Sequence, residues 1–137
     1  MNTKLSLRKR IALELFRSIR KDLVRNHDLK VLFWECTLRC NLNCRHCGSD
    51  CKTEAGKRDM PLNDFLKVLD NISANTDPHK VFVIITGGEP LMRADLEQCG
   101  RAIYDRGFPW GMVTNGLAMT RARFERLLAS GMHTATV

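Results

Sequence analysis

Short apolar runs alternate with longer helical patterns along most of this chain, and this alternation constrains its fold more than any other feature. Four segments are predicted strands: residues 30–35, 81–85, 110–114 and the start of a further strand at 133–137. Between them, the apolar spacing predicts a helix that starts at Pro61, a helix over about 93–106, and a helix that starts near Thr120. Strands and helices that alternate in this way form a parallel sheet with right-handed crossovers. We therefore expect an α/β fold in which the first strand is buried on both faces.

The first 30 residues carry most of the positive charge. They hold nine Lys/Arg against three Asp/Glu, whereas residues 31–137 are nearly neutral, in a chain of net charge +7. Over about 7–25 an apolar residue recurs at every fourth position, which predicts a basic amphipathic helix: Ile11, Leu15, Ile19 and Leu23. The favoured interpretation is that this stripe packs on the rest of the protein; the alternative is a surface helix that contacts anionic lipid or a partner. We expect an N-terminal segment 1–28 and one domain over 29–137.

Charge and hydropathy also narrow the class of protein. Because the positive charge lies on the N-terminal segment and not on the predicted domain, we expect no nucleic-acid partner. Charged residues interrupt the apolar positions near the N-terminus, so a signal peptide is not predicted, and no apolar run approaches the roughly 20 residues that span a bilayer. The expected location is the cytoplasm, where thiols stay reduced and clustered cysteines more often bind metal than form disulfides.

Three cysteines follow the first predicted strand in the compact spacing CxxxCxxC. These residues, Cys40, Cys44 and Cys47, can turn three thiolates toward one point. Three thiolates without a fourth ligand suit a cubane iron–sulfur cluster that keeps one iron open. The competing interpretation is a structural zinc site that recruits one further ligand, for which the candidates are Cys36, Cys51 and His46.

Two further motifs follow the next two predicted strands. Gly87-Gly88-Glu89-Pro90 comes after residues 81–85, and Thr114-Asn115-Gly116 ends the strand after that. The C-terminal ends of parallel strands meet at one edge of the sheet, where α/β proteins form their sites. The two glycines would offer exposed backbone N–H and C=O groups, and Glu89 a carboxylate beside them. That combination suits a ligand with an ammonium group.

Together, these three motifs resemble the radical S-adenosylmethionine (radical SAM) superfamily over roughly residues 29–137. The resemblance implies a TIM-type partial (β/α)6 barrel, of which this chain contains the first three βα units and the start of the fourth strand, after its N-terminal helix. We accordingly expect a fragment or a truncated gene product. In the family, three cysteines bind a [4Fe–4S] cluster, SAM binds the fourth iron, and reductive cleavage of SAM gives a 5′-deoxyadenosyl radical that abstracts a substrate hydrogen.

The resemblance assigns roles position by position. It implies that Cys40, Cys44 and Cys47 are the cluster ligands. It implies that the cofactor-binding residues for SAM come from the other two motifs and from the position before the last cysteine. In this sequence they are Gly87, Gly88 and Glu89 at the methionyl amine, Pro90 completing their motif, His46 near the adenine, and Asn115 at the rim.

The amino-acid sequences of the motifs are similar to those in a particular branch of the superfamily. Thr37, the cysteine motif and Thr114-Asn115-Gly116 resemble peptide- and protein-modifying members with an auxiliary-cluster (SPASM) domain. Residues 33–39 with Gly48-Ser49-Asp50-Cys51 resemble maturase-like members encoded beside small lipoproteins. The resemblance implies a peptide or protein substrate and a reductant such as flavodoxin or ferredoxin. The alternative function is an iron–sulfur electron-transfer or binding module without radical chemistry.

Overall fold

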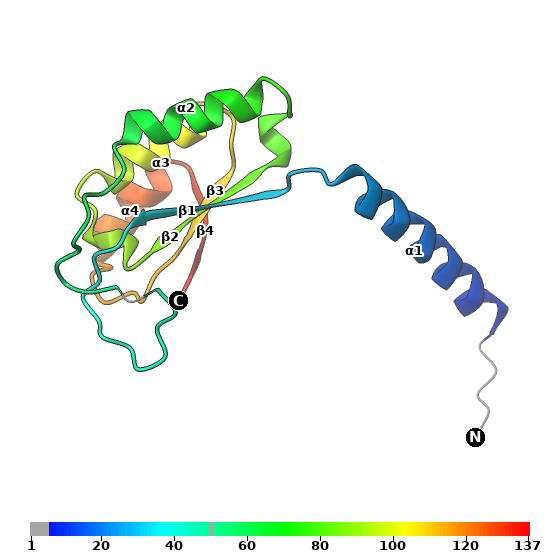
Figure 1. The fold of residues 1–137 in the computed structure, drawn as a ribbon, viewed down its shortest axis with the longest axis horizontal. Helices are drawn as coiled ribbons and strands as arrows, with labels where there is room; N and C mark the ends of the chain where they lie inside the picture. Colours follow the sequence, from blue (N-terminus) through cyan, green and yellow to red (C-terminus); the bar gives the residue numbers. More distant parts are fainter. Residues whose placement is uncertain (1–5, 50) are drawn as a thin grey trace.

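The computed structural model describes residues 6–49 and 51–137, so Asp50 and the first five residues of the predicted segment 1–28 lie outside the described residues. Four strands form one parallel sheet in the order β1-β2-β3-β4 (Figure 1). Their bounds are Val31–Thr37, Phe82–Gly87, Trp110–Val113 and Met132–Thr136. All four lie where the sequence predicts strands, which confirms the α/β class.

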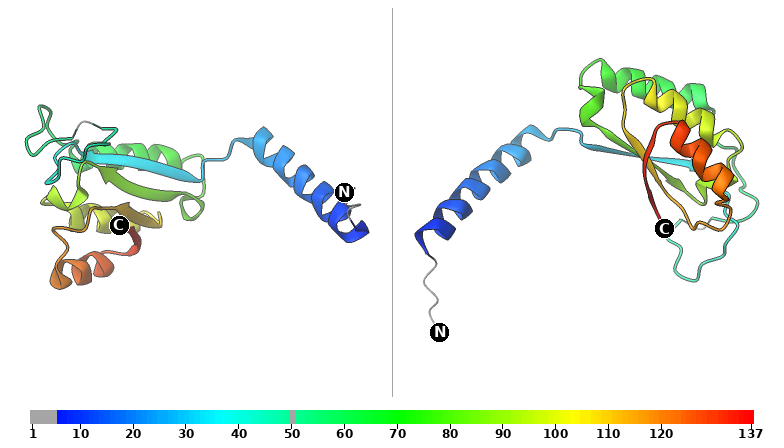
Figure 2. Two further views of the ribbon diagram at one scale, coloured as in Figure 1. Left: turned by 90° about the horizontal axis from the view of Figure 1, so that it is seen from below. Right: turned by 180° about the vertical axis from the view of Figure 1, so that it is seen from behind.

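Three helices connect the strands and pack on one face of the sheet. They are α2 (Leu62–Ser73), α3 (Leu96–Tyr104) and α4 (Arg121–Ala129), and they lie side by side in chain order (Figures 1 and 2). Alternate strand residues that face them are buried, among them Trp34, Ile85 and Met112. In this layer Trp34 stacks on Phe65 of α2, with ring centroids 3.9 Å apart. The core therefore lies between the sheet and a single layer of helices.

The opposite face of the sheet is open, so the expectation that β1 is buried on both faces is wrong. In β1 the outward residues Val31, Phe33 and Glu35 are exposed, and 63% of the Phe33 surface is accessible. The neighbouring residues Ile84 and Thr86 of β2 are half-buried. The physical reason is that sequential right-handed crossovers put every helix on the same side of the sheet.

Helix α1 (Leu7–Asn26) stands apart from the sheet (Figures 1 and 2). None of its residues is buried, and its apolar stripe, including Ile11, Leu15 and Ile19, faces solvent. The helix itself is confirmed, but the favoured interpretation that the stripe packs on the domain is wrong. No helix in the part of the chain that the structure describes has the length and apolar content to cross a membrane.

The third predicted helix begins later than its apolar spacing indicated. A 3₁₀ turn, η2 (Pro90–Met92), follows β2, residues 93–95 lie outside both helices, and α3 starts only at Leu96. The Glu89 carboxylate accepts a hydrogen bond from the Leu91 N–H and caps this turn. Arg93 is then buried at the end of the turn, where its guanidinium contacts β1. A second 3₁₀ turn, η1 (Pro78–Lys80), precedes β2.

Candidate functional site

The start of the cysteine loop is paired with the end of β2. The Gly88 N–H donates to the Thr37 carbonyl and the Glu89 N–H donates to the Arg39 carbonyl, both at 2.8 Å. The Cys40 N–H in turn donates to the Lys52 carbonyl at 2.8 Å. The backbone therefore fixes Cys40 beside the glycine motif, as the meeting of strand ends predicts.

The two glycines are needed for this close approach. Gly87 has a φ of +130°, which side chains other than glycine rarely adopt. A Cβ on Gly88 would overlap with the Arg39 carbonyl oxygen. The expectation that Gly88 offers an exposed N–H is wrong, because that group is bonded to Thr37. The glycines serve first to bring two strand ends together.

Glu89 is fully buried and links the second motif to the third. Its Oε1 accepts hydrogen bonds from the Thr114 hydroxyl at 2.6 Å and from the Leu91 N–H at 2.9 Å. Its Oε2 accepts one from the Asn115 N–H at 2.7 Å. An ionised carboxylate oxygen has about two acceptor positions, so Oε2 keeps one position for a further donor. Pro90, also buried, follows directly and starts the 3₁₀ turn.

Asn115 links the third motif back to the cysteine loop. Its Nδ2 donates to Asn41 Oδ1 at 2.8 Å and lies 4.0 Å from the Cys40 sulfur. Its own side-chain oxygen accepts from the Leu117 N–H at 3.0 Å. A continuous set of hydrogen bonds thus runs from the end of β2 through Glu89 and Asn115 to Cys40.

The remaining cysteines of the loop lie further out. Cys40 is half-buried, whereas Cys44, His46 and Cys47 are exposed. The Cys47 N–H donates to the Cys44 carbonyl at 3.2 Å, which places these two residues on one turn. Within residues 6–49 and 51–137, no three His, Cys, Asp or Glu side chains converge on a point as metal ligands do. The structure therefore brings Cys40, Glu89 and Asn115 together but leaves Cys44, His46 and Cys47 at the loop surface.

The chemistry of the available donors fits an iron–sulfur cluster better than a zinc site that uses Cys36. Cys36 is fully buried under the helices, and this burial raises the pKa of its thiol to about 12 despite the nearby Arg93 charge. A metal ligand must be a thiolate, so Cys36 cannot serve without unfolding the core. Cys51 is also buried, and its thiol donates to the Ser49 carbonyl at 3.5 Å. The three thiols of one short loop, Cys40, Cys44 and Cys47, are the donor set that a three-cysteine cluster requires.

Two charged residues at this edge did not stand out in the sequence. Arg93 donates to the Cys36 carbonyl at 2.7 Å, pairs with Asp95 and lies over the Trp34 ring. Asp59 accepts hydrogen bonds from Thr37 and Arg39. In the sequence, Arg93 is marked only by its position two residues before Asp95. Asp59 is marked only by its position two residues before Pro61, the proline in front of α2. Both patterns are common on protein surfaces.

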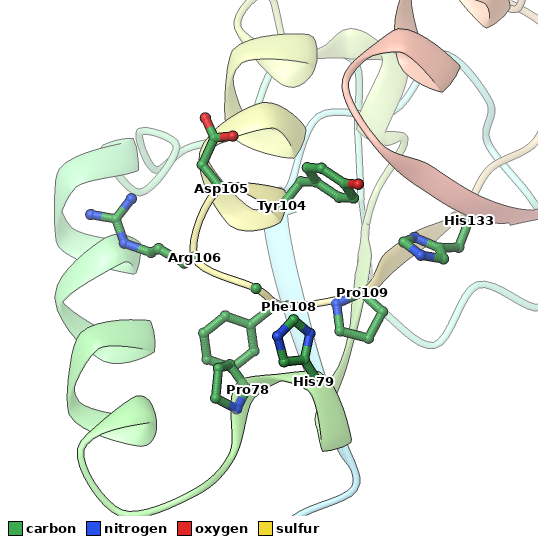
Figure 3. A pocket seen from close by; sticks show the side chains of 9 residues that line it. Pro78, His79, Tyr104, Asp105, Arg106, Phe108, Pro109 and His133 are labelled. Carbon is green, nitrogen blue, oxygen red and sulfur yellow. The ribbon is translucent and has the colours of Figure 1, made fainter.

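A cavity lies at the other end of the sheet, away from the cysteine loop (Figure 3). It has a volume of about 750 Å³, and its lining includes His79, Tyr104, Phe108 and His133. Arg106 at its margin is paired with Asp70 of α2 at 2.8 Å. None of the site residues predicted from the sequence lines this cavity.

Comparison with known proteins identifies both sequence and fold relatives. Residues 34–137 match the model of the Radical SAM superfamily. The chain is 29% identical over 108 residues to the AdoMet-dependent heme synthase of Nitratidesulfovibrio vulgaris (strain Hildenborough), covering 79% of this chain and 29% of that protein. The chain thus spans less than a third of the length of this curated relative.

Solved structures share the fold. BtrN in complex with AdoMet and 2-DOIA superposes with a TM-score of 0.67 at 17% identity, over 79% of this chain and 44% of BtrN. Streptococcus suis SuiB bound to the precursor peptide SuiA superposes with a TM-score of 0.64 at 21% identity, over 98% of this chain and 30% of SuiB. The sheet and its helices therefore have the architecture found in part of these larger proteins, and the partial-barrel expectation is confirmed.

Proposed function

This chain belongs to the radical SAM superfamily, and on that premise we propose that it binds a [4Fe–4S] cluster and SAM at the C-terminal edge of its sheet. Enzymes of the superfamily use these two cofactors. When bound, the cluster, reduced by an external donor, would give one electron to SAM, which would break into methionine and a 5′-deoxyadenosyl radical able to remove a hydrogen atom from a substrate. The observation that carries the proposal is the set of hydrogen bonds joining Cys40, Glu89 and Asn115, one residue from each motif.

Residues of the cysteine loop would bind the cluster and contact the adenine of SAM. Cys40 would hold the cluster from the fixed start of the loop, while Cys44 and Cys47 would supply thiolates from the exposed turn. The exposure of that turn supports this role, because the two thiols can move to the metal without disturbing the core. His46, between them in the sequence, would contact the adenine of SAM.

The second and third motifs would hold the amino-acid end of SAM. Glu89 Oε2 has one remaining acceptor position, which suits the methionyl ammonium group. Gly87 and Gly88 allow the end of β2 to approach Thr37 and Arg39 closely next to Cys40, and Pro90 sets the direction in which the chain leaves. Asn115, whose side-chain amide reaches the cysteine loop, would order the rim of the site.

We further propose that the substrate is a peptide or protein, and that a flavodoxin or ferredoxin supplies the electron. The amino-acid sequences of the motifs support a peptide or protein substrate. The likeness in fold to SuiB, whose structure is known with the precursor peptide SuiA, supports the same substrate class. The heme synthase among the curated relatives marks the main competing substrate class.

Anaerobic reconstitution with iron and sulfide tests the proposal. We expect the wild-type chain to acquire the absorption and reduced-state EPR spectrum of a [4Fe–4S] cluster, and to release 5′-deoxyadenosine with dithionite and SAM. Cys44→Ser should lose the cluster, whereas Cys99→Ala, a change in the core of α3, should keep it. Uptake of zinc and no iron would overturn the proposal. A cluster without SAM cleavage would instead support an electron-transfer or binding module.

A further inference from the structure

The cysteine loop is long, and its two ends meet through one side chain. Residues 38–61 connect β1 to α2 and contain Cys40, Cys44 and Cys47. Asp59, near the return end, accepts a hydrogen bond from the Thr37 hydroxyl at 2.7 Å through Oδ1 and one from the Arg39 guanidinium through Oδ2. The Arg39 N–H also donates to the Thr37 hydroxyl oxygen at 3.1 Å. One carboxylate thus closes the loop onto its first residues.

The contact of Asp59 with Thr37 and Arg39 differs from the nearby Lys67–Asp64 ion pair. Lys67–Asp64 on α2 joins neighbouring turns of one helix, and both of its side chains are more than half exposed. In contrast, the Asp59 side chain is 20% exposed and bridges 20 residues of chain, and its partner Thr37 is buried. Exposed pairs within a helix contribute little, whereas a shielded contact that closes a long loop removes conformational freedom from all of it.

The two residues that Asp59 holds also hold the glycine motif. The Thr37 carbonyl accepts from Gly88 N–H, and the Arg39 carbonyl accepts from Glu89 N–H. Cys40 follows Arg39 directly. A displacement of Asp59 would therefore shift Thr37 and Arg39, and through them Cys40 and the backbone of Gly88 and Glu89.

We propose that Asp59 is a positioning residue for the cluster: through Thr37 and Arg39 it holds the start of the cysteine loop, and with it Cys40, in place against the glycine motif. This inference rests on the proposed function, since it takes the loop cysteines to be cluster ligands. The hydrogen bonds of the Asp59 carboxylate go to Thr37 and Arg39, not to the three cysteines of the loop, so its effect on the cluster would be indirect.

The test compares Asp59→Asn with Asp64→Asn, which makes the same chemical change in the exposed pair on α2. In the apo chain, amide hydrogen exchange at Cys40, Gly88 and Glu89 should accelerate roughly tenfold for Asp59→Asn, the change expected for losing one charge-assisted contact, and stay unchanged for Asp64→Asn. After reconstitution, the half-life of the cluster in the presence of an iron chelator should fall by a similar factor. Asp59→Glu, which keeps the carboxylate, should recover part of the loss.

Further measurements keep the outcomes distinct. Thr37→Val, at similar volume, removes both the hydroxyl donor to Asp59 and the acceptor of the Arg39 N–H, and it should produce a change of the same kind, so the test stands even if Asp59→Asn does not fold by circular dichroism. Wild-type exchange and cluster half-life in folded Asp59→Asn would overturn the role of Asp59 and leave the proposed function intact. Faster exchange with an unchanged cluster half-life would show a structural contact only and would also overturn it. Failure of the wild-type chain to bind any cluster would overturn both proposals.

Discussion

At the scale of single residues, Glu89 and Gly88 make contacts within the protein that form the site before a ligand binds. Glu89 is a carboxylate with no surface exposure, yet three protein donors surround it, so each of its oxygens has at least one hydrogen-bond partner within the protein. Gly88 permits two backbones to touch that any side chain would separate. Each residue is thus part of the scaffold of the site before any ligand arrives.

Glu89→Gln should destabilise the fold. A glutamine places its NH₂ group against either the Asn115 N–H or the Leu91 N–H, so at least one backbone donor is left facing another donor. We expect a loss of about 1–3 kcal/mol in the free energy of unfolding, measured by urea denaturation. Glu125→Gln, in an exposed pair with Arg121, is the matched control and should change stability by less than about 0.5 kcal/mol. Equal effects of the two substitutions would contradict the role of Glu89 as an internal anchor.

Gly88→Ala should separate the cysteine loop from β2. Its methyl group would overlap the Arg39 carbonyl oxygen, which is backbone and can move only with the loop. We expect a loss of roughly 1–3 kcal/mol in stability, as for overpacking elsewhere, with faster exchange of the Glu89 amide. Gly48→Ala is the control, because a Cβ there meets no atom within 4 Å. Unchanged exchange at Glu89 in Gly88→Ala would show that the two backbones do not depend on this close approach.

At the scale of elements, strands and helices followed from sequence patterns, whereas the contacts of the connections did not. Uninterrupted apolar runs located β1 and β2, whereas β3 and β4, which are shorter or more polar, followed from the alternation of strands with helices. The start of α3 was misplaced because Arg93 and Asp95, which the apolar spacing placed in the helix, instead pair with each other at its entrance. The meeting of the three motifs was predictable from parallel strand order. The roles of Arg93 and Asp59 were not, because they depend on partners 57 and 20 residues away.

The ion pairs Arg39–Asp59 and Arg93–Asp95, which lie in the connections between elements, predict how the stability of the fold changes with pH. Burial raises the pKa of Asp59 and of Asp95, but hydrogen bonds and charge from Arg39 and Arg93 more than offset this, so both pKa values lie below the ordinary 3.8. The unfolded chain then binds protons more readily than the folded chain. The free energy of unfolding should therefore be fully retained above the ordinary pKa and decrease as the pH falls from about 5 to about 3.

Urea denaturation at a series of pH values measures this decrease. A variant with Asp59→Asn and Asp95→Asn should be less stable at neutral pH and show a smaller decrease on acidification. Asp64→Asn with Glu125→Gln changes two exposed carboxylates and serves as the control. A slope against pH that is the same in wild type and in the Asp59/Asp95 variant would show that other groups govern acid unfolding.

At the scale of the whole molecule, the chain divides into a packed sheet-and-helix layer and a helix outside it. No residue of α1 is buried, and every residue of the hydrophobic core belongs to the sheet, to the helices α2 to α4 or to their connections. An isolated helix of 20 residues is only marginally stable in water. The stability of the sheet should therefore be independent of α1.

Removal of residues 1–26 should leave the sheet unaffected. We expect the free energy of unfolding to change by less than about 0.5 kcal/mol, as for surface changes in general. Tryptophan fluorescence is a suitable probe because both tryptophans, Trp34 and Trp110, lie in the sheet. Leu69→Ala, in the buried face of α2, should cost about 2–5 kcal/mol and shows the sensitivity of the assay. A loss of more than about 1 kcal/mol on removing α1 would restore the interpretation that its apolar stripe packs on the domain.

The open face of the sheet has a consequence for handling the protein. Apolar side chains such as Phe33 and Val113 face water there, and contact between two such faces would release that water. Because apolar attraction weakens on cooling, we expect dilute, chilled solutions to stay clear and concentrated, warmed ones to become turbid in a reversible way. Light scattering during a slow temperature ramp records this directly, and Phe33→Ser should shift the onset of turbidity to higher temperature.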